Sequence, residues 1–533
     1  MVASRAHPVR RPAELGSSGA PLSALNNIDL LEELLELASA PSRKETVLKL
    51  TRRPPETAAA ETPLLALFCF ADGDCYPPLE LLDEGTAARV RELSAADEFG
   101  GKAGRLELLR PAAGPRRLLL VGLGERDDLT VERLHEAVVG IVGRVEKLGL
   151  KTFSAAPPPL GDGADFAAHH LGLAAGLATF RFDRYRSAEQ RERPRVEELS
   201  VLGNPELDAA LHRAAIVARA QNFARELVSE PVNVLTPVEF ARRVAERAAE
   251  VGLQVEVHDA AWIRRQGMEL IWAVARGAAE EPRFVVLRHH GADGDKPALG
   301  LVGKGVMFDS GGYNLKGSGM ELMKGDMGGS AAVVGAMLAA AELELPVDVL
   351  AVVPAVVNAV DGNAYKPSDV IKSFAGPSVE IGNTDAEGRL TLADGLCWAR
   401  EQGAERLLDI CTLTGASMVA LGVRVGALLT NDELLRDKLL GGVERTGELF
   451  WELPLFEHYA ERLESDIAEI KSTGGKPAGT ISAAKFLERF AGDTPWAHLD
   501  IAGKEFTDKP YGPYRKGATG FGVRTLVELL ESL

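Results

Sequence analysis

The sequence is poor in cysteine, in positive charge and in long apolar runs, and each shortage argues against a class of protein. Only four of its 533 residues are cysteine and none forms a CxxC pair, which argues against a disulfide framework and favours a reducing compartment. Lys and Arg total 60 against 77 Asp and Glu, and the net charge of −17 argues against nucleic acid or an anionic membrane as main partner. The apolar run at 331–341 is too short to span a bilayer. We therefore expect a cytoplasmic protein.

What remains is the composition of a globular protein, with 46% hydrophobic and 26% charged residues. The N-terminus lacks the apolar core of a signal peptide. Its arginines resemble those of an organelle transit peptide, but Pro8, Pro12 and Pro21 oppose an amphipathic helix. We interpret residues 1–28 as a disordered tail.

Strand and helix patterns alternate along most of the chain, which predicts an α/β fold. We expect a smaller N-terminal α/β domain over 29–204 and a linking helix over 205–228. A larger catalytic α/β domain would then fill 229–533, with a mostly parallel central sheet flanked by helices. The segment 299–303 is apolar throughout, which predicts a central strand buried on both faces. Other predicted strands in this domain are 254–258, 284–289, 349–353, 378–381, 407–412, 427–430 and 497–501.

Reactive residues collect just after predicted strands, where ligands bind in sheets of this kind. Lys304 and Asp309 follow the strand at 299–303 within a glycine-rich segment. The segment fits neither a Walker loop nor a dinucleotide fingerprint, and taken alone it reads as a surface turn. Asp326 follows in a second glycine-rich loop that also holds Lys316. An isolated acid there would usually be explained by the dipole of the next helix.

A third cluster, NTDAEGRL at 383–390, precedes a predicted helix over 390–400. If the segment is extended, the side chains of Asp385, Glu387 and Arg389 point the same way. A polar loop with a capping Asp is the simple explanation. A metal site with an anion-holding Arg is the functional one.

Together the clusters supply four carboxylates, Asp309, Asp326, Asp385 and Glu387, which suit two bridged divalent cations better than one. Oxygen ligands suit Zn, Mn or Mg. If Lys304 is a ligand, its amine must be neutral, and Lys316 remains to polarise a carbonyl oxygen. No GxSxG motif is present, so serine-hydrolase chemistry has no support.

The three clusters, in this order, resemble the leucyl aminopeptidase (cytosol aminopeptidase) family of two-metal peptidases. NTDAEGRL matches the family signature, and VGKGVMFDSGG at 302–312 and MKGDMGG at 323–329 match its other metal-binding segments. The likeness runs from about residue 224 to the C-terminus and extends more weakly into the first domain. Gly317 stands where many members have Pro, and the loop 316–326 looks one residue shorter than in the commonest branch, so the preferred substrate side chain stays open.

The resemblance implies a role for each matching residue. The tight metal site would use Lys304, Asp309, Asp326 and Glu387, and the exchangeable site would use Asp309, Asp385 and Glu387. Lys316 would polarise the scissile carbonyl, and Arg389 would hold a bicarbonate ion as general base. Asp326 would also meet the free amine of the substrate. Residues lining the substrate site would be Met323, Thr412, Leu413 and Gly415.

The expected function is hydrolysis of the N-terminal peptide bond of peptides with a free amine, with leucine-type or broad specificity. The expected cofactors are two divalent ions per subunit, Zn or Mn with Mg or Co conceivable in one site, and bicarbonate. The resemblance also implies a homo-hexamer. The alternatives are a two-metal amidase or phosphoesterase and a non-catalytic regulatory homologue.

Overall fold

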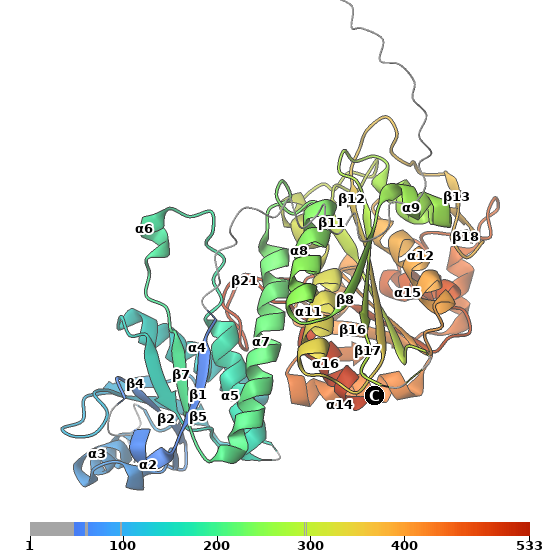
Figure 1. Ribbon diagram of the computed structural model, residues 1–533. Helices are drawn as coiled ribbons and strands as arrows, with labels where there is room; N and C mark the ends of the chain where they lie inside the picture. The colour runs from blue at the N-terminus through green and yellow to red at the C-terminus, as the bar shows by residue number, and fades with distance from the viewer. Residues whose placement is uncertain (1–46, 59–61, 96–98, 162, 293, 295) are drawn as a thin grey trace, which may run out of the picture.

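The structure is a computed structural model that describes residues 47–533 apart from 59–61, 96–98, 162, 293 and 295. The predicted tail at 1–28 lies outside the described residues. The described chain has two α/β domains side by side, each with its own sheet (Figure 1). The predicted fold class is confirmed. Among the described residues, no helix has the length and apolar character needed to cross a membrane.

The N-terminal domain is a seven-stranded sheet in the order β1-β7-β6-β2-β5-β4, with β3 paired to β2. Buried, largely apolar strands such as β2 (LALFCF) and β5 form its centre, and helices α4 and α5 pack their apolar faces against it. The Thr130 hydroxyl accepts a hydrogen bond from the backbone N–H of Arg133 and so caps α4. Its strands are β1 Lys49–Arg53, β2 Leu65–Phe70, β3 Cys75–Tyr76, β4 Leu106–Leu109, β5 Leu118–Gly124, β6 Thr152–Ala155 and β7 Glu198–Leu202. Its helices are α2 Pro55–Ala58, α3 Glu84–Ala95, α4 Val131–Lys147, α5 Ala164–Ala178 and α6 Ala188–Arg191, with 3-10 turns η1 Leu79–Leu81, η2 Arg126–Asp128 and η3 Pro205–Leu207.

One long helix, α7 (Asp208–Ser229), connects the two domains and packs against both (Figure 1). It contacts α5 on one side and α11 of the second domain on the other. Close to it lies a buried imidazole cluster, in which His135 of α4 and His170 of α5 approach to 3.1 Å between ring nitrogens. Burial lowers the pKa of both rings, that of His170 to about 3, so both are neutral at pH 7.

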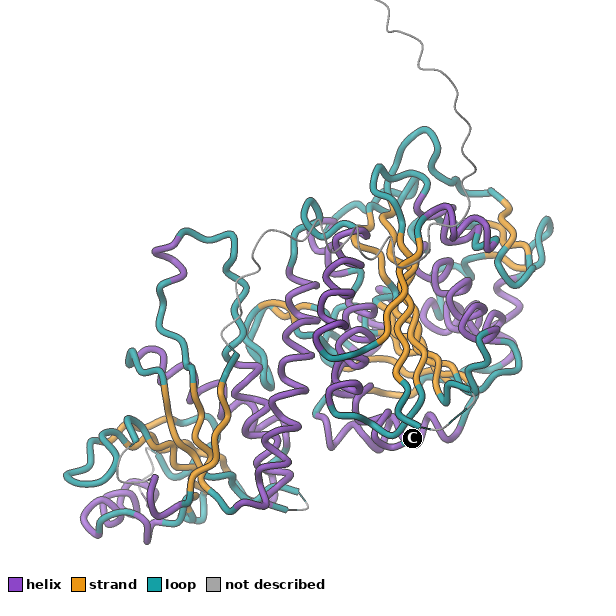
Figure 2. The backbone as a smooth tube through the Cα atoms, viewed as in Figure 1, coloured by secondary structure: helices purple, strands orange, loops and turns teal. Residues whose placement is uncertain are grey.

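The larger domain, which the sequence predicts to be catalytic, is built on a nine-stranded sheet in the order β17-β16-β19-β15-β10-β12-β9-β8, with β11 paired to β12. Its centre is parallel, and β10 lies between β12 and β15 with every residue buried, as predicted for 299–303. Helices cover both faces of this sheet (Figure 2). Its larger strands are β8 Gln254–His258, β9 Arg283–His289, β10 Leu299–Gly303, β11 Gly305–Asp309, β12 Val349–Asn358, β15 Leu407–Cys411, β16 Val425–Thr430, β17 Leu449–Glu452 and β19 Trp496–Asp500. Its helices are α8 Pro237–Glu250, α9 Ala260–Gln266, α10 Glu269–Ala275, α11 Gly328–Glu342, α12 Glu387–Glu401, α13 Gly415–Leu421, α14 Glu433–Thr446, α15 Gly479–Ala491 and α16 Val523–Ser532, with 3-10 turns η4 Met320–Gly325 and η5 Glu457–Leu463.

One predicted strand belongs to a separate small sheet, and one local expectation differs from the structure. The predicted strand at 378–381 is β14 (Ser378–Glu380), which joins β13 (Val370–Lys372) and β18 (Ile470–Lys471) in a separate small sheet. The remaining pair, β20 (Phe506–Thr507) and β21 (Gly517–Ala518), forms a two-stranded sheet. The segment at 385–389 is not extended, because α12 already begins at Glu387, three residues before the predicted start. Strand alternation therefore does not explain how these side chains converge.

Candidate active site

The site lies where the central parallel strands of the nine-stranded sheet end. Lys304 follows β10 directly, and Asp309 ends β11 after a one-residue break in the strand. Asp326 lies between η4 and the start of α11, and Glu387 opens α12. Because parallel strands end at one edge of a sheet, these four residues meet although they are spread over more than eighty positions.

Lys304 lies between two acids in the buried interior of the site. Its Nζ is 2.8 Å from Asp326 Oδ1 and 2.8 Å from Glu387 Oε1, and it donates a hydrogen bond of 3.1 Å to the carbonyl oxygen of Thr412. Burial opposes the charge on Lys304, but the two carboxylates outweigh it and raise the pKa of the amine. Burial also raises the pKa of Asp326 well above its usual value.

Glycine allows this approach of Lys304 to the start of α12. A Cβ at Gly388 would lie 2.7 Å from Lys304 Nζ and 2.6 Å from Lys304 Cε. A similar constraint holds at the start of α11, where a Cβ at Gly329 would lie 2.0 Å from the carbonyl oxygen of Ile410. The glycines of these motifs therefore bring helix ends close to the strand exits.

Lys316 makes a second ion-pair group with Asp309 and Asp385. Its Nζ is 2.6 Å from Asp309 Oδ2 and 2.6 Å from Asp385 Oδ1. Burial opposes its charge, but the nearby carboxylates of Asp309 and Glu387 raise the pKa of Lys316, so it stays protonated at neutral pH. Burial and the Glu387 charge raise the pKa of Asp309 to about 7.

Three of these acids fit a metal ion. Asp309, Asp326 and Glu387 each offer a carboxylate oxygen within 4.8 Å of the other two, and all three are buried. Asp326 Oδ2 and Glu387 Oε2 are buried and have no hydrogen-bond partner among the described residues. Buried carboxylate oxygens without partners are costly unless a cation is present, so this donor set suits a divalent ion. Asp385 lies outside this trio, with a third of its side chain exposed beside Lys316.

Arg389 lies in the first turn of α12, two residues after Glu387. It is buried, and its Nη1 donates a hydrogen bond of 2.8 Å to the carbonyl oxygen of Ser472. Its Nε is buried and has no partner among the described residues. Burial lowers the pKa of the guanidinium, which remains charged and can hold an anion.

The loop after β15 forms another wall of the site. The Thr412 hydroxyl donates a hydrogen bond of 2.8 Å to Asp326 Oδ1. The backbone N–H groups of Leu413 and Thr414 donate to Asp500 Oδ1 at 3.3 and 3.4 Å, which fixes the loop before Gly415 starts α13. Met323, in η4, is partly buried.

The comparisons with known proteins cover both domains. A sequence model described as the catalytic domain of the cytosol aminopeptidase family matches residues 222–527, and one for the N-terminal domain of the same family matches 66–189. A probable cytosol aminopeptidase of Geobacter sp. (strain M21) is 43% identical over 478 residues, covering 88% of this chain and 96% of that protein. One from Aquifex aeolicus is 39% identical over 471 residues, covering 87% and 94%.

The chain belongs to the cytosol aminopeptidase family. Solved structures agree with this membership. A tomato leucine aminopeptidase variant is 31% identical with a TM-score of 0.83, covering 92% of this chain and 98% of that one. The bottromycin maturation enzyme BotP in complex with Mn is 35% identical with a TM-score of 0.79, covering 89% and 99%. The comparisons confirm the predicted family. They also confirm the predicted class of enzyme, a metal-dependent aminopeptidase.

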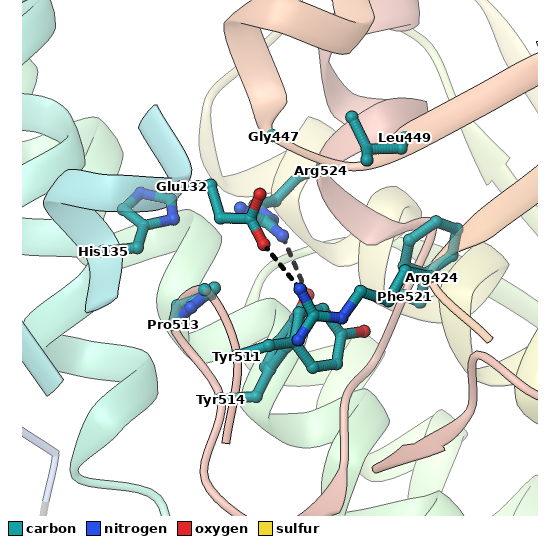
Figure 3. Close-up of a pocket in the computed structure, with 11 residues that line it drawn as sticks. Glu132, His135, Arg424, Gly447, Leu449, Tyr511, Pro513, Tyr514, Phe521 and Arg524 are labelled. Carbon is teal, nitrogen blue, oxygen red and sulfur yellow. Dashed lines mark hydrogen bonds and ion pairs between the residues drawn. The ribbon is translucent and has the colours of Figure 1, made fainter. Parts of the chain in front are cut away.

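A small cavity elsewhere is not part of this site. Figure 3 shows it between α4, represented by Glu132 and His135, and segments of the catalytic domain that carry Arg424, Tyr511 and Arg524. None of the predicted site residues lines it. Glu132 and Arg424 meet across the domain boundary at 3.5 Å. The cavity is a feature of the contact between the domains.

Sequence reasoning missed a buried group behind the carboxylates. Asn358, the last residue of β12, donates from its Nδ2 to Asp309 Oδ1 at 2.8 Å and to the carbonyl oxygen of Thr384 at 3.0 Å. The Tyr365 hydroxyl donates to the same carbonyl at 2.7 Å. Asp309 Oδ1 also accepts from the N–H of Gly311 at 2.9 Å, so Oδ2 is the oxygen of this carboxylate that faces the site. The available signal was an Asn that ends a ten-residue apolar strand at a strand exit.

Proposed function

We propose that the chain removes the N-terminal residue from peptides with a free amine, using two divalent ions held by the lysine–carboxylate groups. The observation that carries the proposal is the buried trio Asp309, Asp326 and Glu387. Two of its carboxylate oxygens have no partner within the described part of the chain, and two lysines are ion-paired among the acids. Burying so many charged groups costs free energy unless cations compensate them, and such clusters are typical of functional sites. The substrate class, leucine-type or broad, is inferred from the relatives' names and from family resemblance.

The residues divide into two proposed metal sites. Lys304, Asp309, Asp326 and Glu387 would hold one ion, and Asp309, Asp385 and Glu387 the other, so Asp309 and Glu387 would bridge. Lys304 must give up the proton with which it now pairs to Asp326 and Glu387, because only a neutral amine has a lone pair to donate. Zn or Mn suits these ligands, with Mg or Co conceivable in one site. When bound, such ions act as Lewis acids and lower the pKa of a water molecule.

Lys316 is the proposed electrophile supplied by the chain itself. It keeps its proton because Asp309 and Asp385 surround its amine at 2.6 Å. A protonated amine can donate a hydrogen bond to the scissile carbonyl oxygen and stabilise the negative charge that develops there. Arg389, with a buried Nε free of partners among the described residues, is proposed to hold a bicarbonate ion as general base.

The substrate is proposed to enter the site with its free amine first. Asp326 carries one buried oxygen that no described residue contacts by a hydrogen bond, and it is proposed to meet the substrate amine. Met323, Thr412, Leu413 and Gly415 are proposed to line the pocket for the first side chain. We also propose a cytoplasmic homo-hexamer, which family resemblance supports.

The test compares release of leucine from a Leu-peptide and from its N-acetylated twin. The enzyme is stripped of metal and refilled with Zn or Mn. Cleavage of the free-amine peptide only, and only with metal, supports the proposal. Equal cleavage of both peptides points to an amidase or endopeptidase, and no cleavage with any metal points to a non-catalytic homologue.

A pair of variants separates the roles of ligand and electrophile. Lys316→Ala should lose turnover and keep its metal content, because Lys316 is not a proposed ligand. Glu387→Ala should lose both, because it removes a proposed bridge. Normal metal content in Glu387→Ala would refute the bridging role.

A further inference from the structure

Two of the four cysteines face each other in the N-terminal domain, far from the catalytic residues in the sequence. Cys69 on β2 is the register partner of Cys75 on the adjacent antiparallel strand β3. Their sulfur atoms lie 2.6 Å apart, and both residues are buried as free thiols. By contrast, Cys397 contacts the carbonyl oxygen of Phe490 and Cys411 ends β15, in the other domain.

The backbone at this pair suits a covalent bond between the sulfur atoms. The next pair along the ladder is hydrogen-bonded, since the N–H of Phe70 donates to the carbonyl oxygen of Asp74 at 2.8 Å. Cys69 and Cys75 therefore form a non-hydrogen-bonded pair, in which Cα atoms are about 4.5 Å apart. Disulfides span Cα separations of about 4.4–6.8 Å, so this pair can close without moving the strands.

The two thiols also differ in character. Contact with the Cys69 thiol lowers the pKa of Cys75, with further help from the hydroxyl of Ser94 and against the effect of burial. The same contact, together with burial, raises the pKa of Cys69. Cys75 is also the more exposed of the two, at 7% against 0%. Cys75 therefore suits the role of attacking thiolate, and Cys69 that of resolving thiol.

We propose that Cys69 and Cys75 form a reversible disulfide when the protein meets a peroxide. The Cys75 thiolate attacks one peroxide oxygen, the O–O bond breaks, and the departing hydroxide takes a proton to become water. The Cys69 sulfur then attacks the sulfur of the Cys75 sulfenic acid. The S–O bond breaks and the hydroxyl leaves as water with the Cys69 proton. Two thiols lose two electrons, and the peroxide is reduced to two molecules of water.

The disulfide would fasten the hairpin at 71–74 to an interior strand of the N-terminal sheet. Arg126 already holds this hairpin through Asp72 at 3.2 Å and Asp74 at 2.6 Å, and its guanidinium lies 4.5 Å from the Phe70 ring centroid. The proposed catalytic and metal-binding residues all lie between 304 and 415, in the other domain. We therefore assign the disulfide a stabilising role in the N-terminal domain, with no effect on peptidase activity.

The experiment treats the full-length enzyme with a small excess of hydrogen peroxide, then counts thiols after denaturation and maps the peptides. The free thiols should fall from four to two, and a single cross-linked peptide pair should contain Cys69 and Cys75. A dithiol reductant should restore all four. Four remaining thiols, a bond that involves Cys397 or Cys411, or sulfinic acid at Cys75 without a cross-link would each overturn the proposal.

Two variants serve as matched controls. The melting temperature and the peptidase rate are measured on the wild-type enzyme. Cys397→Ser should still form the bond, and Cys69→Ser should carry peroxide-oxidised Cys75 that does not cross-link. Oxidised wild-type enzyme should melt at a higher temperature than reduced enzyme, with the same rate on a Leu-peptide. A changed rate would contradict the purely stabilising role, and an unchanged melting temperature would contradict the fastening of the hairpin.

Discussion

Replacing Asn358 by Ala should weaken metal binding although Asn358 is not a proposed ligand. Its amide donates to Asp309 Oδ1 at 2.8 Å, and both groups are buried. A hydrogen bond to a charged acceptor is worth about 1.5–3 kcal/mol, and loss of a group that orients a metal ligand typically costs about 10–100-fold in affinity. Thr384 keeps its bond from the Tyr365 hydroxyl, so the loss falls mainly on Asp309.

The assay titrates Mn into metal-stripped enzyme and measures both the dissociation constant and kcat/KM at saturating metal. Asn358→Ala should bind the ion about 10–100-fold more weakly and regain part of its activity at high metal concentration. The matched control is Asn363→Ala, an exposed Asn in the loop that follows β12. Tyr365→Phe should have a smaller effect, because Asn358 still holds the Thr384 carbonyl. An unchanged dissociation constant in Asn358→Ala would refute the orienting role.

Two other outcomes follow from the structure. Gly388→Ala should lose most activity while the protein stays folded, because the new Cβ would lie 2.7 Å from Lys304 Nζ and displace that amine. Gly317→Ala is the control, because its Cβ would meet no described atom within 4 Å. Activity and melting temperature are measured for both variants. Buried His135 and His170 should also contribute a loss of stability as the pH falls below about 6.5, the pKa of an unfolded His, because both stay neutral in the fold while the unfolded chain takes up protons.

The pH effect has a defined slope. Each such imidazole contributes about 1.4 kcal/mol of lost stability per pH unit, and for His170 the loss levels off near its folded pKa of about 3. Urea denaturation at several values between about pH 7 and 5 measures this slope. His135→Asn should flatten the profile relative to wild type. Acids whose pKa the fold raises to about 7, such as Asp309, contribute the opposite slope in wild type and variant alike, so the comparison isolates the imidazole. Equal slopes in wild type and His135→Asn would show that the buried ring does not titrate as described.

The local sequence predicted much of the fold and the place where reactive residues collect. Apolar runs such as 299–303 predicted buried central strands, because a strand covered on both faces has no polar positions. Carboxylates and lysines just after such strands predicted where chemistry would collect, because parallel strands end at one edge. The motifs around Asp326 and Glu387 then identified the family, which the comparisons confirm.

The family resemblance grouped these residues, but only the tertiary structure decided which amine pairs with which acid. The pairing of Lys304 with Asp326 and Glu387, and of Lys316 with Asp309 and Asp385, joins segments that no local pattern relates. The early start of α12 replaced the expected strand alternation, because Glu387 and Arg389 already lie in the first turn of the helix.

The same reason explains what was missed. The contact of Asn358 with Asp309 spans 49 positions, and a hydrogen bond between distant segments leaves no periodic trace in the sequence. Cys69 and Cys75 are only six positions apart, yet their meeting depends on a strand register that spacing alone does not fix. The sequence shows that there are four cysteines, but only the hairpin geometry brings two of them into contact.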